Sequence, residues 1–156
     1  NNGDYIMIPH EVAQQFYYSK DWSGFKHEWW GDVYRAQRFY TKPEQPDQGS
    51  SQDEWDDYFS EMTTWSNTHP LELGGGYAIV CAYCDAHKSF VWNFEHILPV
   101  RKYWDLRLNP TNIVIACNHC NKEKGNKVLR NVSDIVKKYQ LDVARENNIQ
   151  LGFDYV

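Results

Sequence analysis

The stretch FEHILP, residues 94–99, places a carboxylate beside an imidazole within otherwise apolar sequence. Burying either group is costly unless another group binds it, so Glu95 and His96 need partners. Imidazole titrates near neutral pH and can serve as a general base, while a carboxylate offers the hard oxygen ligand that Mg²⁺ and Mn²⁺ prefer. The pair therefore indicates metal-dependent hydrolysis. The alternative is a surface glutamate next to a hydrogen-bonded core histidine.

All four cysteines lie in the second half of the chain, as Cys81-Ala-Tyr-Cys84 and Cys117-Asn-His-Cys120. Disulfides between cysteines so close in sequence form strained loops, whereas two such pairs suit one tetrahedral Zn²⁺. The pairs are separated by 32 residues (117 − 84 − 1), more than the usual spacing of about 15–20, so a segment is inserted between them. Redox dithiols or buried thiols are the alternatives. We expect His119 to point to solvent rather than to bind the metal.

Four motifs follow one another along the chain: CAYC, FEHILP, NPTNIVIACNHCN and KGNK. Their order resembles the HNH endonuclease family, which has a ββα-metal core and, in one branch, two zinc knuckles. The resemblance covers about residues 78–130, a third of the chain. The residues within these motifs also resemble those of HNH branches found in bacterial mobile-element and anti-phage proteins. This resemblance suggests a bacterial or phage protein.

The resemblance implies an α+β fold and a role for each polar residue of the motifs. His96 would activate water, and Asn112 would tie down a loop and orient the His96 ring. Glu95 and Asn121 would hold one Mg²⁺ or Mn²⁺, while the cysteines hold a structural Zn²⁺ away from the chemistry. Hydrolysis of DNA would leave a 5′-phosphate and a 3′-hydroxyl. Two residues depart from the common pattern, because Glu95 replaces an aspartate and Asn121 replaces a histidine.

Basic residues cluster around these motifs and are candidates for contacting DNA phosphates. The predicted set is Arg101, Lys102, Lys122, Lys124 and Lys127, with Arg107 and Arg130 close by. A solvated, charged helix face is the alternative. The N-terminal aromatic residues Trp22, Trp29, Trp30 and Tyr34 could stack on bases, but their spacing favours packing in a core.

The elements that must position these residues follow from the hydrophobic pattern. Helices are expected over about residues 10–20, with Val12, Phe16 and Tyr17 inward, and after Ser51, which forms a capping box with Glu54. Strands are expected at 77–80, 90–94 and 112–116, a short helix after Cys120, and a last helix from Ser133 to about Asn147.

Charge divides the chain near the glycine run 74–76. Residues 1–80 carry 5 Lys/Arg and 13 Asp/Glu, whereas residues 81–156 carry 11 and 8. We therefore predict an acidic, aromatic-rich helical extension at 1–76 and an HNH nuclease domain with a C-terminal helix at 77–156. The acidic extension could bind a protein partner or regulatory subunit. The oligomeric state is not predicted.

Composition also limits the functional classes. No stretch approaches the roughly 20 apolar residues that span a bilayer, so a cytoplasmic location without a membrane contact is expected. An overall charge of −5 argues against indiscriminate coating of nucleic acid, although a local basic site remains compatible with it. Two alternatives to a self-sufficient nuclease stay open: a non-catalytic zinc module that binds nucleic acid or protein, and a nuclease switched on by another subunit.

Overall fold

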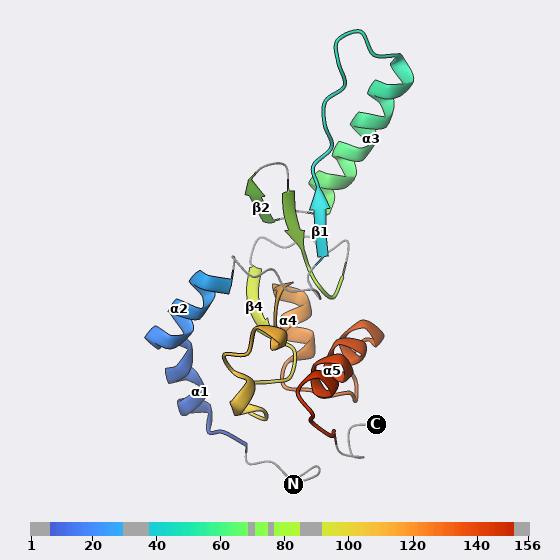
Figure 1. Ribbon diagram of the computed structural model, residues 1–156. Helices are drawn as coiled ribbons and strands as arrows, with labels where there is room; N and C mark the ends of the chain where they lie inside the picture. The colour runs from blue at the N-terminus through green and yellow to red at the C-terminus, as the bar shows by residue number, and fades with distance from the viewer. Residues whose placement is uncertain (1–6, 30–37, 69–70, 75–76, 85–91, 152–156) are drawn as a thin grey trace.

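The computed structural model describes residues 7–29, 38–68, 71–74, 77–84 and 92–151. Its elements confirm the predicted α+β class, with helices around small antiparallel sheets (Figure 1). Trp30 and Tyr34, two of the aromatic residues weighed above, lie outside the described residues. Within the described part, no helix has the length and apolarity needed to cross a membrane.

The centre of the structure is a hairpin of β4 (Trp92–His96) and β5 (Ile113–Cys117), which pair antiparallel with His96 opposite Ile113. Helix α4 (Asn118–Lys124) follows β5 without a linker and ends at Gly125, whose positive φ of 51° favours glycine. Strand, strand and short helix therefore occur in the predicted order. Helix α5 (Asp134–Glu146) begins at Ser133, whose Oγ accepts a hydrogen bond from the Val136 amide.

The connection between β4 and β5 contains two short 3₁₀ turns, η1 (Trp104–Leu106) and η2 (Pro110–Asn112). The side chain of Asn109 caps η2 by accepting a hydrogen bond from the Thr111 amide. Asn112 therefore stands at the end of a turn, immediately before the strand in which the sequence pattern had placed it. Ile113 and Val114, the first two residues of β5, follow it and are fully buried.

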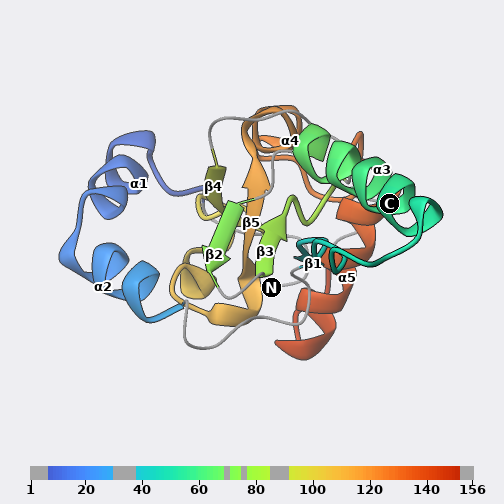
Figure 2. The same ribbon diagram turned by 90° about the horizontal axis from the view of Figure 1, so that it is seen from above.

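The two faces of the hairpin pack against different apolar clusters, because side chains alternate along a strand. Val114 and Ala116 belong to a cluster with α5, and Ile113 and Ile115 belong to one with the N-terminal helices. Figures 1 and 2 show α5 on one side of the hairpin and α1 and α2 on the other. Neighbouring residues of β4 consequently meet different surroundings.

The N-terminal helices are α1 (His10–Tyr17) and α2 (Lys20–Trp29). Trp22 and Trp29 are buried, which confirms the prediction that they pack in a core. The prediction for α1 was partly wrong: Phe16 is buried, but Val12 and Tyr17 are about 40% exposed and Ala13 takes an inward position. The reason is that α1 packs on the hairpin through a narrow face, while the flanking positions contact solvent.

A projecting arm joins the N-terminal helices to the hairpin. It contains β1 (Arg38–Thr41), α3 (Gln52–Thr68) and β2 (Leu71–Gly74), and β3 (Tyr77–Val80) lies between β1 and β2 in a three-stranded antiparallel sheet. The Ser51 cap of α3 is confirmed. In Figure 1, α3 extends away from the hairpin. Its row of aromatic residues comprises Trp55, Tyr58, Phe59 and Trp65, and of these only Trp65 is buried.

The sheet of the arm was not predicted, because short strands at 38–41 and 71–74 carry too little periodic signal. It also crosses the proposed boundary between 1–76 and 77–156, since β3 pairs with two strands from the N-terminal side. The division into two domains stays a prediction.

Candidate functional site

The four cysteine sulfurs form a cluster in which all the ligand atoms lie within 4.8 Å of one another. Cys84 Sγ and Cys117 Sγ are 3.7 Å apart, close to the edge of about 3.8 Å expected for a tetrahedron with Zn–S bonds of about 2.3 Å. The backbone amides of Tyr83 and Cys120 point at the sulfurs of Cys81 and Cys117, at 3.4 and 3.5 Å. The donor set therefore fits a structural Zn²⁺.

Burial raises the pKa of the Cys84 thiol to about 12, and the neighbouring Cys81 adds to that rise. The pKa of Cys120 is raised as well, mainly by burial. Without a cation these sulfurs would stay protonated, and a bound metal would displace the protons. His119 takes no part in the cluster, because its Nε2 lies 3.0 Å from the Glu123 carboxylate on the exposed side of α4.

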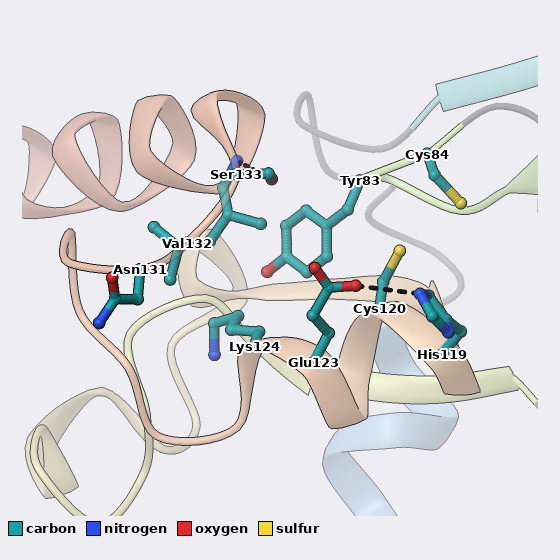
Figure 3. A pocket seen from close by; sticks show the side chains of 10 residues that line it. Tyr83, Cys84, His119, Cys120, Glu123, Lys124, Asn131, Val132 and Ser133 are labelled. Atoms are coloured by element: carbon teal, nitrogen blue, oxygen red, sulfur yellow. Dashed lines mark hydrogen bonds and ion pairs between the residues drawn. The ribbon is translucent and has the colours of Figure 1, made fainter.

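A pocket of about 190 Å³ lies beside the cysteine cluster, between α4 and the start of α5. Figure 3 shows Tyr83 and Lys124 between the cysteine side and the turn that carries Asn131 and Ser133. The salt bridge between His119 and Glu123 lies at its rim. Tyr83 and Lys124, which line this pocket, are also the two side chains that reach Glu95.

Glu95 faces this side of the hairpin and is almost fully buried. One of its oxygens accepts a hydrogen bond from the Tyr83 hydroxyl, and the other lies 2.8 Å from Lys124 Nζ. Lys124 Nζ also donates to the His96 carbonyl oxygen at 2.8 Å. Burial raises the pKa of Glu95, while Lys124 and Tyr83 counteract that rise. Both carboxylate oxygens are therefore engaged within the protein.

His96 faces the opposite side of β4 and is 4% exposed. Its Nε2 lies 2.9 Å from the carbonyl oxygen of Arg107, which can only accept a hydrogen bond. Nε2 must therefore carry the proton, and Nδ1 is left as an acceptor. Burial lowers the pKa of His96 to about 4, which keeps the ring neutral at neutral pH.

Nδ1 of His96 lies 3.4 Å from the hydroxyl of Tyr17, at the end of α1. The ring of Trp22 stacks on the imidazole, with centroids 5.0 Å apart and planes 25° from parallel. Burial, together with the charge of Glu95, raises the pKa of Tyr17 to about 12, so its hydroxyl stays protonated. The N-terminal helices thus complete the surroundings of His96.

Asn112 is fully buried and ties the connection between β4 and β5 to the hairpin. Its Oδ1 accepts from the Leu98 amide at 2.7 Å, and its Nδ2 donates to the carbonyl oxygens of Leu98 and Leu106, at 3.0 and 3.5 Å. The residue after Leu106 is Arg107, the partner of His96. Asn112 therefore holds the segment that carries the carbonyl acceptor of the histidine.

Asn121 lines an open groove of about 420 Å³ between α2 and β4. The groove is also lined by Tyr17, Trp22, Lys26, Trp92, Asn93 and Phe94. Asn121 therefore lies on the side of the hairpin where Tyr17 and Trp22 contact His96. Glu95 lies on the other side, where it contacts Tyr83 and Lys124. The two predicted metal ligands therefore face opposite sides of the hairpin.

The predicted phosphate contacts divide into two groups. Lys122 and Lys127 are exposed on and after α4, and Lys102 is half-buried. Arg101 donates from Nε to the carbonyl oxygen of Ile8 at 2.8 Å, and Lys124 is buried against Glu95. Arg101 and Lys124 thus have partners within the chain, which the pattern of charges did not predict.

Three contributors to the site were not foreseen as such. Tyr83 is a spacer of the first cysteine pair, and Tyr17 was expected to be an ordinary core residue. Trp22 was expected to pack in a core, with base stacking as the alternative. No sequence signal links them to Glu95 and His96, because the contacts span 12, 79 and 74 positions (95 − 83, 96 − 17 and 96 − 22). Only the packing of the helices on the hairpin brings them together.

Comparison with known families supports the sequence resemblance. Residues 81–127 match the family model described as HNH endonuclease. The match covers less than a third of the chain. It includes the four cysteines, the Glu95–His96 pair, Asn112 and Asn121. No curated protein and no solved structure gave a significant match. HNH domains are generally nucleases that use divalent metals, so the match points to a function on nucleic acid with metal binding.

Proposed function

We propose that the chain is a metal-dependent HNH endonuclease that hydrolyses DNA phosphodiester bonds, with His96 as the general base. The observation that carries this proposal is the hydrogen bond from His96 Nε2 to the Arg107 carbonyl oxygen, at 2.9 Å. It fixes the tautomer in which Nδ1 can accept a proton from water.

Asn112 acts as a positioning residue in this proposal. Its three hydrogen bonds to Leu98 and Leu106 hold the connection between β4 and β5 in place. Arg107, the residue after Leu106, carries the carbonyl oxygen that accepts from His96 Nε2. The ring is thereby kept in one orientation, which is what a general base requires. Cys81, Cys84, Cys117 and Cys120 act at a distance, because their Zn²⁺ would join β5 and α4 to the segment after β3.

Glu95 and Asn121 are the proposed ligands of a single Mg²⁺ or Mn²⁺. Such an ion would polarise the scissile phosphate and stabilise the leaving 3′ oxygen. In the arrangement described, the charge of Glu95 is already balanced by Lys124 at 2.8 Å. Glu95 also lies on the side of the hairpin opposite Asn121. The two can share one ion only when Lys124 releases the carboxylate and it turns toward the groove. Asn121 has its side chain at the groove and needs no such exchange.

The substrate is proposed to lie along the groove that contains Asn121. Lys26 stands over the rings of Trp22 and Phe94, 5.6 and 6.0 Å from their centroids, and contributes positive charge there. Lys122 and Lys127 are the exposed members of the predicted phosphate-binding set. The acidic arm residues repel phosphate, so DNA is expected to avoid the arm.

The test is incubation of the purified protein with supercoiled plasmid in Mg²⁺, in Mn²⁺ and in EDTA. Nicked or linear product should form only with a divalent ion, and the products should carry 5′-phosphate ends. His96→Ala should abolish cleavage while the protein stays folded and keeps its zinc. His27→Ala, which removes an exposed histidine of α2, is the matched control and should cut like the parent. Equal cleavage by the His96 variant would overturn the proposal.

The alternative function is a non-catalytic zinc module that binds nucleic acid or a protein partner. One observation favours it: both Glu95 and His96 are engaged by side chains of the protein itself. A module of this kind would bind DNA with the same affinity in the parent and in His96→Ala, and neither would cut in any metal. Metal-dependent cleavage by the parent excludes it.

A further inference from the structure

The hydroxyl of Tyr17 stands where the attacking water would have to be. A general base must lie within about 2.6–3.2 Å of the water oxygen whose proton it takes, or reach it through one other water. The atom next to Nδ1 of His96 is instead the Tyr17 hydroxyl oxygen, at 3.4 Å. Tyr17 also lines the groove that contains Asn121 and is close enough to Glu95 for that charge to raise its pKa. The Tyr17 phenol thus lies against His96 Nδ1 and on the wall of the groove that Asn121 lines.

The rest of His96 is covered by the same pair of helices. Trp22 stacks on one face of the imidazole, and Phe16 packs at 6.1 Å between ring centroids. With 4% of its surface exposed, His96 has almost no contact with solvent. A phosphodiester has no route to Nδ1 while Tyr17 and Trp22 remain in place.

The helices are attached to the nuclease segment by buried apolar contacts of Phe16, Trp22 and Trp29 and by a pair of hydrogen bonds. The Ile8 amide donates to the Arg101 carbonyl oxygen at 2.8 Å, and Arg101 Nε donates back to the Ile8 carbonyl oxygen at 2.8 Å. Phe16 contacts the edge of Trp104, with centroids 5.6 Å apart. Tyr17 itself remains 41% exposed, so the cover over Nδ1 is one side chain thick. Tyr17 can therefore leave Nδ1 by a local movement, whereas displacing both helices would also break the buried contacts.

We infer that α1 and α2 form an inhibitory cap on the nuclease site, with Tyr17 as the plug at His96 Nδ1, and that the structure describes the closed state. The inference rests on the proposed function and adds its regulation. The phenol is a plug rather than a nucleophile, because its raised pKa keeps the hydroxyl protonated. Activity of the closed protein is then limited to the fraction of molecules in which the cap has moved.

The first test measures access to His96 without any reference to cleavage. The full chain is treated with diethyl pyrocarbonate, and modification of each histidine is followed by mass spectrometry. In the parent, His96 should react far more slowly than the exposed His10 and His27. Tyr17→Ala should speed the reaction at His96 about tenfold or more, while His10 and His27 stay unchanged. Should the alanine variant fail to fold, Tyr17→Leu takes its place, since it keeps apolar contacts and removes the ring.

Tyr18→Ala is the matched control, because Tyr18 is the next residue, has the same side chain and is 85% exposed. It should leave the reactivity of His96 at the parent value. Reaction of His96 in the parent at the rate of His10, or equal effects of Tyr17→Ala and Tyr18→Ala, would overturn the cap.

The second test compares plasmid cleavage by the same proteins. Tyr17→Ala should cut about tenfold faster than the parent and Tyr18→Ala, because a larger fraction of molecules is open. If His96 becomes reactive in Tyr17→Ala but no variant cuts in any metal, the cap stands and the proposed nuclease function fails. If His96 becomes reactive and cleavage falls below the parent rate, Tyr17 assists the reaction and the inhibitory role is wrong.

Discussion

The ammonium of Lys124 lies 2.8 Å from the carboxylate of Glu95, and both side chains are almost completely buried. The two come from different elements, α4 and β4, so their contact joins the helix to the hairpin. Tyr83, from the first cysteine pair, completes the group through its hydroxyl. These three residues therefore also join the first cysteine pair, β4 and α4 to one another.

Removal of one partner of this pair should be costly. Lys124→Met leaves a buried carboxylate without its cation, which destabilises a protein by about 3–5 kcal/mol. The measurement is the free energy of unfolding from urea titration at pH 7. Lys122→Met, at an exposed position of the same helix, should change it by less than about 0.5 kcal/mol. The double variant Glu95→Gln with Lys124→Met should recover part of the loss, and equal small effects of the two lysine variants would contradict the ion pair.

Asn112→Ala should destabilise the fold through the polar groups it leaves unpaired. The Leu98 amide and carbonyl groups lose their partner in a fully buried position, at a cost of about 3 kcal/mol. Thermal unfolding followed by circular dichroism measures the change. Asn126→Ala is the control, because Asn126 is exposed after α4, and its melting curve should overlay that of the parent.

Zinc removal should disrupt the HNH segment. Elemental analysis is expected to find one zinc per chain, and a strong chelator should lower the melting temperature by about 10 °C or more, because binding energy at a structural site is folding energy. Cys117→Ser should have the same effect, because it removes one of the four sulfur ligands while a serine can still cap α4. His119→Ala should retain the zinc and the melting temperature, and loss of the metal from this variant would make His119 a ligand after all.

Stability should depend on pH through His96. Burial lowers the pKa of His96 to about 4, below the value of about 6.5 in an unfolded chain. The unfolded chain therefore binds the proton first, and the stability contributed above pH 6.5 is lost as the pH falls toward 4. Between pH 7 and pH 5 the loss should be about 2 kcal/mol.

His96→Gln carries no titrating group at this position and should lack that part of the pH dependence. The free energy of unfolding is measured for both proteins at pH 7 and pH 5, with zinc content checked at each pH. The difference between the two proteins should shrink or reverse toward pH 5. Parallel pH curves would show that the covering of His96 has been misjudged.

The individual motifs could be predicted from the sequence because their signals are local. The spacing within CAYC and CNHC favours a shared metal site over redox or buried thiols, and the sulfurs do converge. The Ser51 and Ser133 caps, the stop at Gly125 and the strands at β3 and β5 follow from residue types at neighbouring positions. The roles of His96, Asn112 and Asn121 in catalysis stay predictions.

Tertiary packing decided what could not be predicted. Alternation along β4 sends Glu95 and His96 to opposite faces, but which helices cover each face depends on contacts between residues far apart in sequence. The row of aromatic residues on α3 shows the same limit: its period predicts a helix, yet the helix projects and leaves Phe59 58% exposed.

The sequence by itself determined the chemistry available to this protein, since the sulfurs, the imidazole and the oxygen donors and their order are written in the chain. Only the tertiary structure decided whether those groups face solvent or one another. Lys124 binds Glu95, and Tyr17 meets His96, because apolar surfaces on α4, α1 and the hairpin are buried together. The free energy of that burial is summed over many side chains, and no short motif encodes it.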